Sequence, residues 1–275
     1  QKVFDNLLAR DVVTWTALIA GYTDHGHAKE ALRCFDTMQR EGVHPDAVTF
    51  VCSLKACGLM ENVTKASEIH MQISRRGLER NLIVGSALVD MYAKSGLIVE
   101  ARQVLEELHI RDVVSWSSLI AGYAEEGQGH QALECFAKMQ REGLSPNEVT
   151  YICILKACGS VRTVDKGEQI HEEIANKGLL LNNIVLGNAL VDMYVKFGSL
   201  MKAEQVLMEL PIRSVVSWNS LISGYVLQNK GQEALKYFRR MQSEGIFPDE
   251  VTFICIAKAC AIVGNIERAK QIHNE

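Results

Sequence analysis

Apolar residues recur along this chain with the period of an α-helix. Within 113–147, Trp116, Leu119, Ile120 and Tyr123 follow an i, i+3, i+4, i+7 spacing, which places their side chains on one helical face. Two glycines interrupt this pattern, and a second apolar stripe then follows at Ala132, Leu133, Phe136 and Met139. The segment closes with a glycine and a proline, which favour the end of a helix. The pattern therefore predicts a hairpin of two short helices.

The same hairpin recurs at a nearly fixed interval. The tryptophan that opens the hairpin recurs after 101 and then after 102 residues, at Trp15, Trp116 and Trp218. A proline, a lysine, a cysteine and a histidine keep the same two intervals, at Pro45, Pro146 and Pro248, Lys55, Lys156 and Lys258, Cys57, Cys158 and Cys260, and His70, His171 and His273. Such a repeat indicates stacked supersecondary units that bury their apolar faces against their neighbours. We therefore predict an all-α fold in one elongated array, although ~150 residues per globular domain would suggest about two domains.

Each long unit divides into three kinds of hairpin that differ in length. The first kind spans 12–46, 113–147 and 215–249, the second spans 47–81 and 148–183, and the third spans 82–112 and 184–214. Residues 1–11 resemble the tail of the third kind, and residues 250–275 break off inside the second kind. The sequence has no initiator Met and no targeting segment, so we expect it to be a fragment.

Composition and charge narrow the class of protein. The chain is 48% hydrophobic with a mean hydropathy of +0.02, and no apolar run approaches the ~18 residues of a membrane span. A net charge of −4 and a pI of about 6.1 argue against bulk attraction to nucleic acid, but they leave room for a local basic stripe. The eight cysteines recur inside helical patterns without a C-x-x-C pair, which favours buried reduced thiols over zinc ligands or disulfides. We predict no metal, no cofactor and no membrane contact.

Three repeated phrases carry a resemblance to a known family. VVSWNSLISGY at 215–225, GNALVDMYVKFG at 187–198, and LKACG followed by GEQIH at 155–171 resemble the PLS subfamily of plant pentatricopeptide repeat proteins. The three hairpin lengths are similar to the P, L and S motifs of that subfamily, in the same order. The resemblance covers the whole chain and implies a right-handed α-solenoid superhelix of helical hairpins. It also implies binding of single-stranded RNA, with one motif for each base.

The resemblance implies that the fifth and last residues of each motif select the base. In the P and S motifs these pairs are Thr16 with Asp46, Ser86 with Asp112, Ser117 with Asn147, Asn188 with Ser214, and Asn219 with Asp249. In the L motifs they are Val51 with Asn81 and Ile152 with Asn183, where the aliphatic fifth residue cannot hydrogen-bond and we expect weak readout. The family code then implies the site 5′-G-N-G-A-N-C-U-3′, with N undetermined.

Hydrogen-bond chemistry gives this code a physical reason. Uracil and guanine present a ring N–H and need an acceptor, and an ionised Asp offers only acceptors. Adenine and cytosine present a ring nitrogen that accepts, so Asn or Ser can donate to them. For the fifth residue, Ser or Thr leaves room for a purine, whereas the longer Asn suits a pyrimidine.

Two further sets of residues follow from the resemblance. The second residue of each motif is implied to lie between successive bases, and these residues are Val13, Val48, Ile83, Val114, Val149, Val185, Val216 and Val251. All eight are β-branched and therefore stiff; ordinary helix-entry packing is the alternative interpretation. Lys94 and Lys196 are candidate phosphate contacts, or else cations that stabilise a helix C-terminus. The P motifs lack a lysine at that position, so we expect a shallow salt dependence of binding.

The resemblance implies a role in C-to-U RNA editing in mitochondria or chloroplasts. A cytidine deaminase domain, in cis or in trans, would supply the chemistry, and the L motifs would bind small editing cofactor proteins. His171 and Glu173 form an H-x-E, but zinc deaminases also need a C-x-x-C, which the chain lacks, so we predict no catalytic residue here. The alternative is a helical scaffold that binds proteins and reads no RNA. Against that scaffold, the fifth position varies among Thr, Ser and Asn while its neighbours hardly change.

Overall fold

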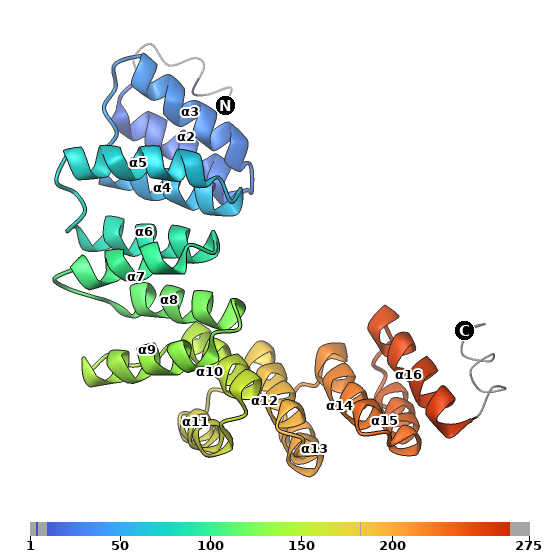
Figure 1. Cartoon of the computed structure of the whole chain (residues 1–275). Helices are drawn as coiled ribbons and strands as arrows, with labels where there is room; N and C mark the ends of the chain where they lie inside the picture. The colour runs from blue at the N-terminus through green and yellow to red at the C-terminus, as the bar shows by residue number, and fades with distance from the viewer. Residues whose placement is uncertain (1–3, 5–9, 182, 265–275) are drawn as a thin grey trace. The chain divides into compact units, whose positions relative to one another are not determined.

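The computed structural model describes residues 4, 10–181 and 183–264, and all the regular structure in this part of the chain is helical (Figure 1). Two compact units divide the chain, residues 1–147 and residues 148–275. The prediction of an all-α fold is confirmed. None of the helices in the described residues is long and apolar enough to cross a membrane.

The first unit contains four hairpins. Their helices are α2 (Val12–Asp24), α3 (Ala28–Arg40), α4 (Ala47–Leu59), α5 (Val63–Arg75), α6 (Leu82–Lys94), α7 (Ile98–Glu107), α8 (Val113–Glu125) and α9 (Gly129–Arg141). The first helices of successive hairpins contact one another, α2 with α4, α4 with α6 and α6 with α8. Each second helix packs on its own first helix, and α3, α5 and α7 also contact the next first helix. The unit therefore has a layer of first helices and a layer of second helices, as the repeat predicts.

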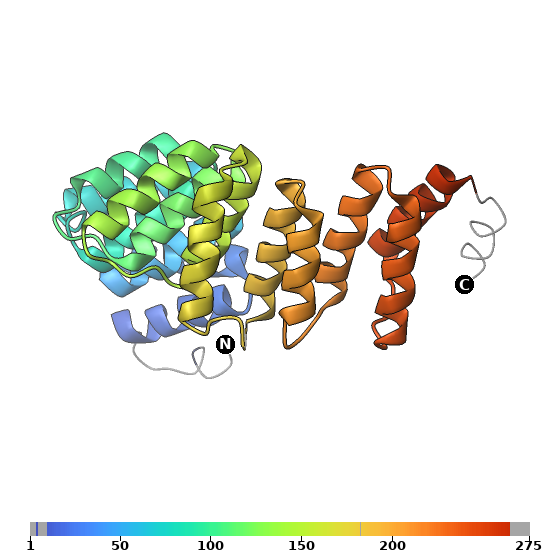
Figure 2. The ribbon, with the colours of Figure 1, turned by 90° about the horizontal axis from the view of Figure 1, so that it is seen from below.

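The second unit is built in the same way. Its helices are α10 (Glu148–Val161), α11 (Val164–Asn176), α12 (Ile184–Lys196), α13 (Leu200–Glu209), α14 (Val215–Leu227), α15 (Gly231–Ser243) and α16 (Glu250–Val263). The first helices again contact in order, α10 with α12, α12 with α14 and α14 with α16. Figure 2 shows the hairpins α12–α13 and α14–α15 side by side.

Every first helix begins at the first residue of a predicted hairpin, from Val12 in α2 to Glu250 in α16. The second helices of the two S-type hairpins, α7 and α13, have 10 residues, whereas α3, α5, α9, α11 and α15 have 13. This difference of about one turn accounts for the shorter S-type repeat. Of the predicted terminal pieces, most of 1–11 and all of 265–275 lie outside the described residues.

The apolar stripes predicted from the sequence form the core. Trp15, Trp116 and Trp218 are at most 5% exposed, so their predicted packing role is confirmed. Phe35 and Phe136 of the second helices, and Phe50 and Tyr151 of the L-type first helices α4 and α10, are fully buried. All eight cysteines are free thiols. Five are buried, but Cys34, Cys52 and Cys153 are partly exposed, so the prediction of burial was too broad.

A glycine at the tenth position of the P-type first helices permits close packing. A Cβ added at Gly224 would lie 2.8 Å from both Leu200 Cδ2 and Val195 Cγ1, on the two helices of the preceding hairpin. In α2 none of the described residues lies within 4 Å of the same atom added at the equivalent Gly21. The two glycines therefore form a matched pair that differs in packing and shares a helical position.

Gly224→Ala is expected to lower the free energy of unfolding, because Val195 is β-branched and cannot turn aside; overpacking of this kind costs about 1–3 kcal/mol. Gly21→Ala should raise it by ~0.5–1 kcal/mol, because alanine is the better helix former and meets no neighbour there. Urea unfolding followed by circular dichroism measures both. Equal effects of the two substitutions would contradict the packing described for α14.

Candidate nucleic-acid interface

The last residue of six predicted motifs is the N-cap of the next first helix, at Asp46, Asn81, Asp112, Asn183, Ser214 and Asp249. Asp46, Asp112 and Asp249 each accept the backbone N–H three residues later at 2.8 Å. Ser214 caps α14 in the same way, and the hydroxyl of the third helical residue returns a contact to the cap backbone, which completes a capping box. The predicted base-selecting residue thus also holds the start of a helix.

The fifth residue of the motif meets this cap from the preceding first helix. Ser86 Oγ donates to Asp112 Oδ1 at 3.1 Å, and Asn219 Nδ2 donates to Asp249 Oδ1 at 2.8 Å. In the second S-type hairpin Ser214 Oγ donates to Asn188 Oδ1 at 2.9 Å. Side chains 26 to 30 residues apart in the sequence are therefore paired in space.

A third polar side chain, which sequence reasoning missed, joins two of these sites. Thr252 Oγ1 donates to Asn219 Oδ1 at 2.6 Å and to Asp249 Oδ1 at 2.9 Å. In the first P-type hairpin Thr16 and Thr49 share a hydrogen bond of 2.6 Å, and Thr49 Oγ1 donates to Asp46 Oδ1 at 2.8 Å. Thr16 and Asp46 are thus connected through Thr49. The signal was present in the sequence, as a Thr three residues after Asp46 and after Asp249.

The three aspartates keep one carboxylate oxygen for a further partner. In Asp46, Asp112 and Asp249 the hydrogen bonds end on Oδ1, and Oδ2 accepts none from the described residues. Burial opposes ionisation of Asp249, but hydrogen bonds from the Thr252 backbone, Asn219 and the Thr252 hydroxyl outweigh it and lower its pKa. An ionised acceptor is therefore available beside the fifth residue.

Four of the fifth residues lie below the surface. Thr16, Ser86, Ser117 and Asn219 are 4 to 9% exposed, and Asn188 is partly exposed. The last residues are more open: Asp46 and Asn147 are exposed, and Asp112, Ser214 and Asp249 are partly exposed. Within the first unit Ser117 is buried in α8 and Asn147 is exposed after α9; their pairing stays a prediction.

The eight second residues are exposed, although all are aliphatic. Their exposed fractions run from 52 to 67%, at Val13, Val48, Ile83, Val114, Val149, Val185, Val216 and Val251. Ordinary helix-entry packing would bury these side chains, so that alternative is not supported. Their predicted contact with bases stays a prediction.

One open hollow in the first unit is lined by second, fifth and last residues of the predicted motifs. Its volume is about 340 Å³, and it is lined by Ile83 and Val114, the second residues of successive motifs, and by Ser86 with Asp112. Val51, the fifth residue of the preceding L motif, also lines it. Small-molecule sites start at ~300 Å³, so a planar base is of suitable size.

The two L motifs assemble no such polar pair. Val51 and Ile152 are partly exposed, and the third residues of the helices that follow are the buried apolar Val84 and Leu186. Asn81 and Asn183 use their side-chain oxygens to cap α6 and α12. Asn183 Nδ2 also donates to Glu148 Oε2 at 2.6 Å. The weak readout expected at these motifs stays a prediction.

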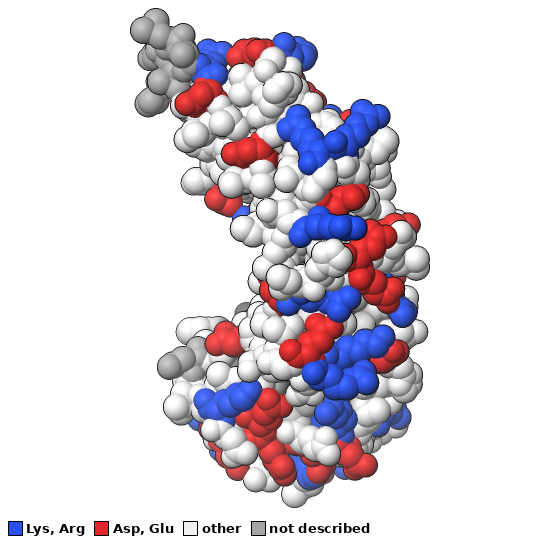
Figure 3. All heavy atoms as spheres, turned by 90° about the vertical axis from the view of Figure 1, so that its left-hand side faces the viewer, with Lys and Arg blue, Asp and Glu red and all other residues white. Residues whose placement is uncertain are grey.

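The candidate phosphate contacts are already paired. Lys94 Nζ lies 2.6 Å from Asp90 Oδ2, and Lys196 Nζ lies 2.8 Å from Asp192 Oδ2, each one turn earlier in the same helix. Both lysine side chains remain substantially exposed. On the face turned to the viewer in Figure 3, Lys and Arg alternate with Asp and Glu, and neither sign forms an unbroken field.

Comparison with known proteins identifies the family. The sequence profile of the PPR repeat family matches residues 10–58, 111–160 and 213–262, and the PPR repeat profile matches residues 86–113 and 188–215. The chain belongs to the pentatricopeptide repeat family. The assignment to the PLS subfamily is finer than these matches and remains a proposal.

Several pentatricopeptide repeat proteins of Arabidopsis thaliana are similar over nearly the whole chain. The pentatricopeptide repeat-containing protein At2g33680 is 39% identical over 97% of this chain and 37% of its own length. The protein CRR2, chloroplastic, is 38% identical over 99% of this chain and 42% of its own length. The chain thus spans about two fifths of these relatives.

A solved structure shares the fold. The crystal structure of the pentatricopeptide repeat protein PPR10 in complex with an 18-nt psaJ RNA element superposes with a TM-score of 0.82 at 21% identity. The superposition covers 96% of this chain and 40% of that one. The likeness confirms the predicted α-solenoid of helical repeats.

The double role of the capping residue can be separated by mutation. Asp249→Ala removes the cap of α16 and should lower the free energy of unfolding by about 1 kcal/mol, whereas Asp249→Ser should keep most of it, because Ser214 caps α14. The carboxylate has a lowered pKa in the folded chain, so its contribution is present above pH ~4 and is lost as the pH falls through the folded pKa. Urea unfolding at pH 7 and pH 3 measures both effects. A stability of Asp249→Ala equal to that of the unmodified chain at pH 7 would contradict the cap.

Proposed function

We propose that this chain binds single-stranded RNA along the starts of its first helices, with one motif for each base. The carrying observation is the direct contact of the fifth and last side chains in three motifs, at 2.8 to 3.1 Å. The row of exposed aliphatic second residues supports the proposal, because bases stack on apolar faces. The protein in the similar structure is also bound to RNA.

The two selecting residues would have different roles. Thr16, Ser86, Ser117 and Asn219 are buried, and there the size of the fifth residue would limit how deeply a base enters. The last residue is more exposed and presents its remaining acceptor, Oδ2, when it is Asp. An ionised Asp accepts from the ring N–H of guanine or uracil and repels the ring acceptors of adenine and cytosine.

The proposed register gives one base to each complete motif. Thr16 with Asp46 and Ser86 with Asp112 would select G, Ser117 with Asn147 would select A, Asn188 with Ser214 would select C, and Asn219 with Asp249 would select U. The L motifs at Val51 and Ile152 would tolerate any base. The proposed site is 5′-G-N-G-A-N-C-U-3′.

Electrostatics should contribute little to this binding. The chain carries a net charge of −4, and the side chains of Lys94 and Lys196 are each paired with an aspartate. Few counterions would be released from the RNA, so the affinity should fall only slowly with salt.

We further propose that the chain specifies a site for C-to-U editing in a mitochondrion or chloroplast. Relatives are named as mitochondrial or chloroplastic pentatricopeptide repeat proteins. A cytidine deaminase in cis or in trans would supply the reaction, and editing cofactor proteins would bind at the L motifs. The two side chains of the chain's own H-x-E contact different partners. His171 Nδ1 contacts the Tyr194 hydroxyl at 3.0 Å, while Glu173 accepts from Tyr151 and Lys177.

The alternative is a helical scaffold that binds a protein and reads no base. Such a scaffold has no need of a polar pair repeated at each P and S motif. Two measurements distinguish these functions.

An RNA heptamer of the sequence GNGANCU, with U at both undetermined positions, should bind more tightly than a scrambled heptamer of the same composition. Each mismatch in a specific nucleic-acid site costs about 1–3 kcal/mol, so the difference should reach at least tenfold. Gel shifts at two salt concentrations measure the preference and its salt slope. Equal binding of both oligomers would reject base readout by this chain.

Asn219→Thr should move the preference at the last base from U to G. The replacement reproduces the Thr16, Thr49 and Asp46 arrangement, because Thr252 and Asp249 already occupy the other two places. The ratio of the affinities for the heptamer ending in G and the heptamer ending in U should rise about tenfold. Ser118→Thr, on the first helix of another motif but outside the selecting pair, is the control. An unmoved preference in Asn219→Thr would reject the proposed register.

A further inference from the structure

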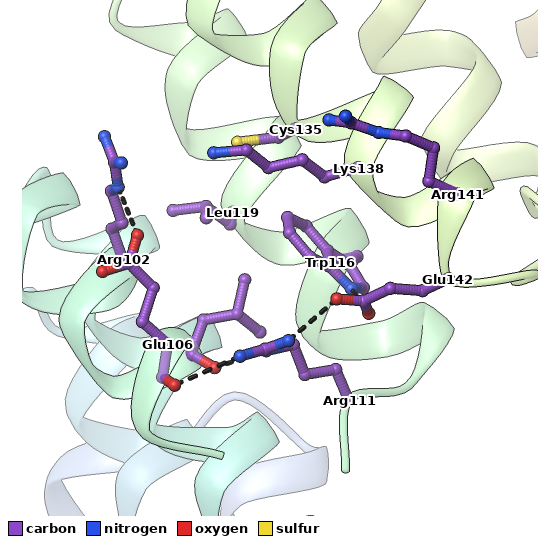
Figure 4. Close-up of a pocket in the computed structure, with 10 residues that line it drawn as sticks. Arg102, Glu106, Arg111, Trp116, Leu119, Cys135, Lys138, Arg141 and Glu142 are labelled. Carbon is purple, nitrogen blue, oxygen red and sulfur yellow. Dashed lines mark hydrogen bonds and ion pairs between the residues drawn. The ribbon is translucent and has the colours of Figure 1, made fainter. Parts of the chain in front are cut away.

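A second hollow lies in the first unit, away from the selecting residues. It has a volume of about 390 Å³ and an apolar floor formed by Leu105, Trp116, Leu119 and Cys135 (Figure 4). It is formed mainly by α7 and α9, which are second helices, together with α8. None of the residues predicted to contact RNA lines it.

The short second helix of the S motif opens this hollow. Helix α7 ends at Glu107 after 10 residues, and Leu108 leaves it in an extended conformation. Arg111 then turns back over the uncovered helix end, where Nε donates to Leu105 O at 2.8 Å and Nη2 to Glu106 O at 3.1 Å. One wall is therefore fixed by hydrogen bonds to the last carbonyls of α7.

The carboxylate of the residue that follows α9 connects this wall to the floor. Glu142 accepts from Arg111 Nη1 and from Trp116 Nε1, each at 2.8 Å (Figure 4). The indole is thereby held in one orientation with its N–H satisfied. The rest of the indole ring belongs to the apolar floor and needs no polar partner.

The corresponding hairpins of the second unit differ at several places: Trp218 Nε1 has no hydrogen-bond partner among the described residues, and Glu204 and Ser243 stand where Arg102 and Arg141 stand in the first unit. Tyr237 in α15 stands where Cys135 stands in α9, at the seventh position of each helix. The Tyr237 side chain is 3% exposed, and its ring stacks on Tyr225 with centroids 4.9 Å apart. A tyrosine at this position thus packs into the hairpin, whereas the much smaller cysteine leaves the first-unit hollow open.

Charge around the hollow is opposite in sign to that of the whole chain. Four cations line it, Arg102, Arg111, Lys138 and Arg141, against the two carboxylates Glu106 and Glu142, so the lining carries two more positive than negative charges. Arg102 is paired with Glu106, Arg111 with Glu142, and Lys138 with Glu134, which is outside the lining. The chain as a whole has a net charge of −4. Figure 4 shows Arg102, Lys138 and Arg141 around the floor that Leu119 and Trp116 form. An apolar floor inside a cationic rim is complementary to an apolar side chain flanked by carboxylates.

We propose that this hollow docks an acidic segment of a partner protein. An aromatic or large aliphatic side chain would lie on Trp116 and Leu119, and flanking carboxylates would meet Arg102, Lys138 and Arg141. An RNA backbone carries a charge on every nucleotide, whereas the lining has only two more positive than negative charges, so an apolar side chain flanked by two carboxylates fits the hollow better. The site is independent of base readout and does not rest on it.

The test uses the whole chain and the peptide acetyl-Glu-Phe-Glu-amide as the probe, with saturation-transfer NMR of the phenyl protons and a titration for affinity. Acetyl-Lys-Phe-Lys-amide and acetyl-Glu-Ala-Glu-amide are the controls and should bind at least fivefold more weakly. Cys135→Tyr should weaken the acidic peptide at least tenfold, because it places in the hollow the ring that Tyr237 places in the second unit. The same variant should leave binding of the RNA heptamer unchanged.

A charge variant tests the rim without altering the floor. Lys138→Glu should weaken the acidic peptide at least fivefold, whereas Arg240→Glu, the equivalent position beside Tyr237, should leave it unchanged. Both side chains are partly exposed, so both variants are expected to fold, even if Cys135→Tyr does not. Equal binding of all three peptides, or equal effects of the two charge variants, would overturn the proposal. Displacement of the peptide by the RNA heptamer would also overturn it and assign the hollow to nucleic acid.

Discussion

The structure depends on the hydrogen bond between the side chain that ends each hairpin and the backbone that starts the next. At Asp46, Asp112, Ser214 and Asp249 this bond satisfies a helix N–H that would otherwise lack a partner. The same cap side chain also contacts the fifth residue of the preceding first helix in three motifs. The atoms that connect the hairpins are therefore also those proposed to select the base.

The fold was predictable from the sequence because its repeat states the same pattern several times. Tryptophan, proline and histidine at constant intervals gave the register, and each first helix begins where the pattern placed it, as at Val12 and Val215. In three motifs the fifth and last residues contact each other, and their role in base selection stays a prediction. Their burial was not predicted, since a small polar residue beside a tryptophan is compatible with either surface or interior.

Other features could not be predicted because they depend on contacts between hairpins. Thr49 and Thr252 look like ordinary capping-box residues, and only the packing of neighbouring first helices brings them to Thr16 and Asn219. The hollow beside Trp116 results from a helix one turn shorter than its neighbours and from a small residue at Cys135. Each cause is visible in the sequence, but their coincidence in space is not.

The capping role limits which residue types can occupy the last position of a motif. Only side chains with a short-reach acceptor, such as Asp, Asn, Ser and Thr, stabilise a helix start well. Among these, Asp is an obligate acceptor when ionised, while Asn, Ser and Thr can also donate, so the set already contains the two hydrogen-bond polarities that distinguish nucleobases. The residue types that cap a helix can thus be exchanged for one another with little loss of stability. A solenoid of this kind can therefore acquire a new target without a change of fold.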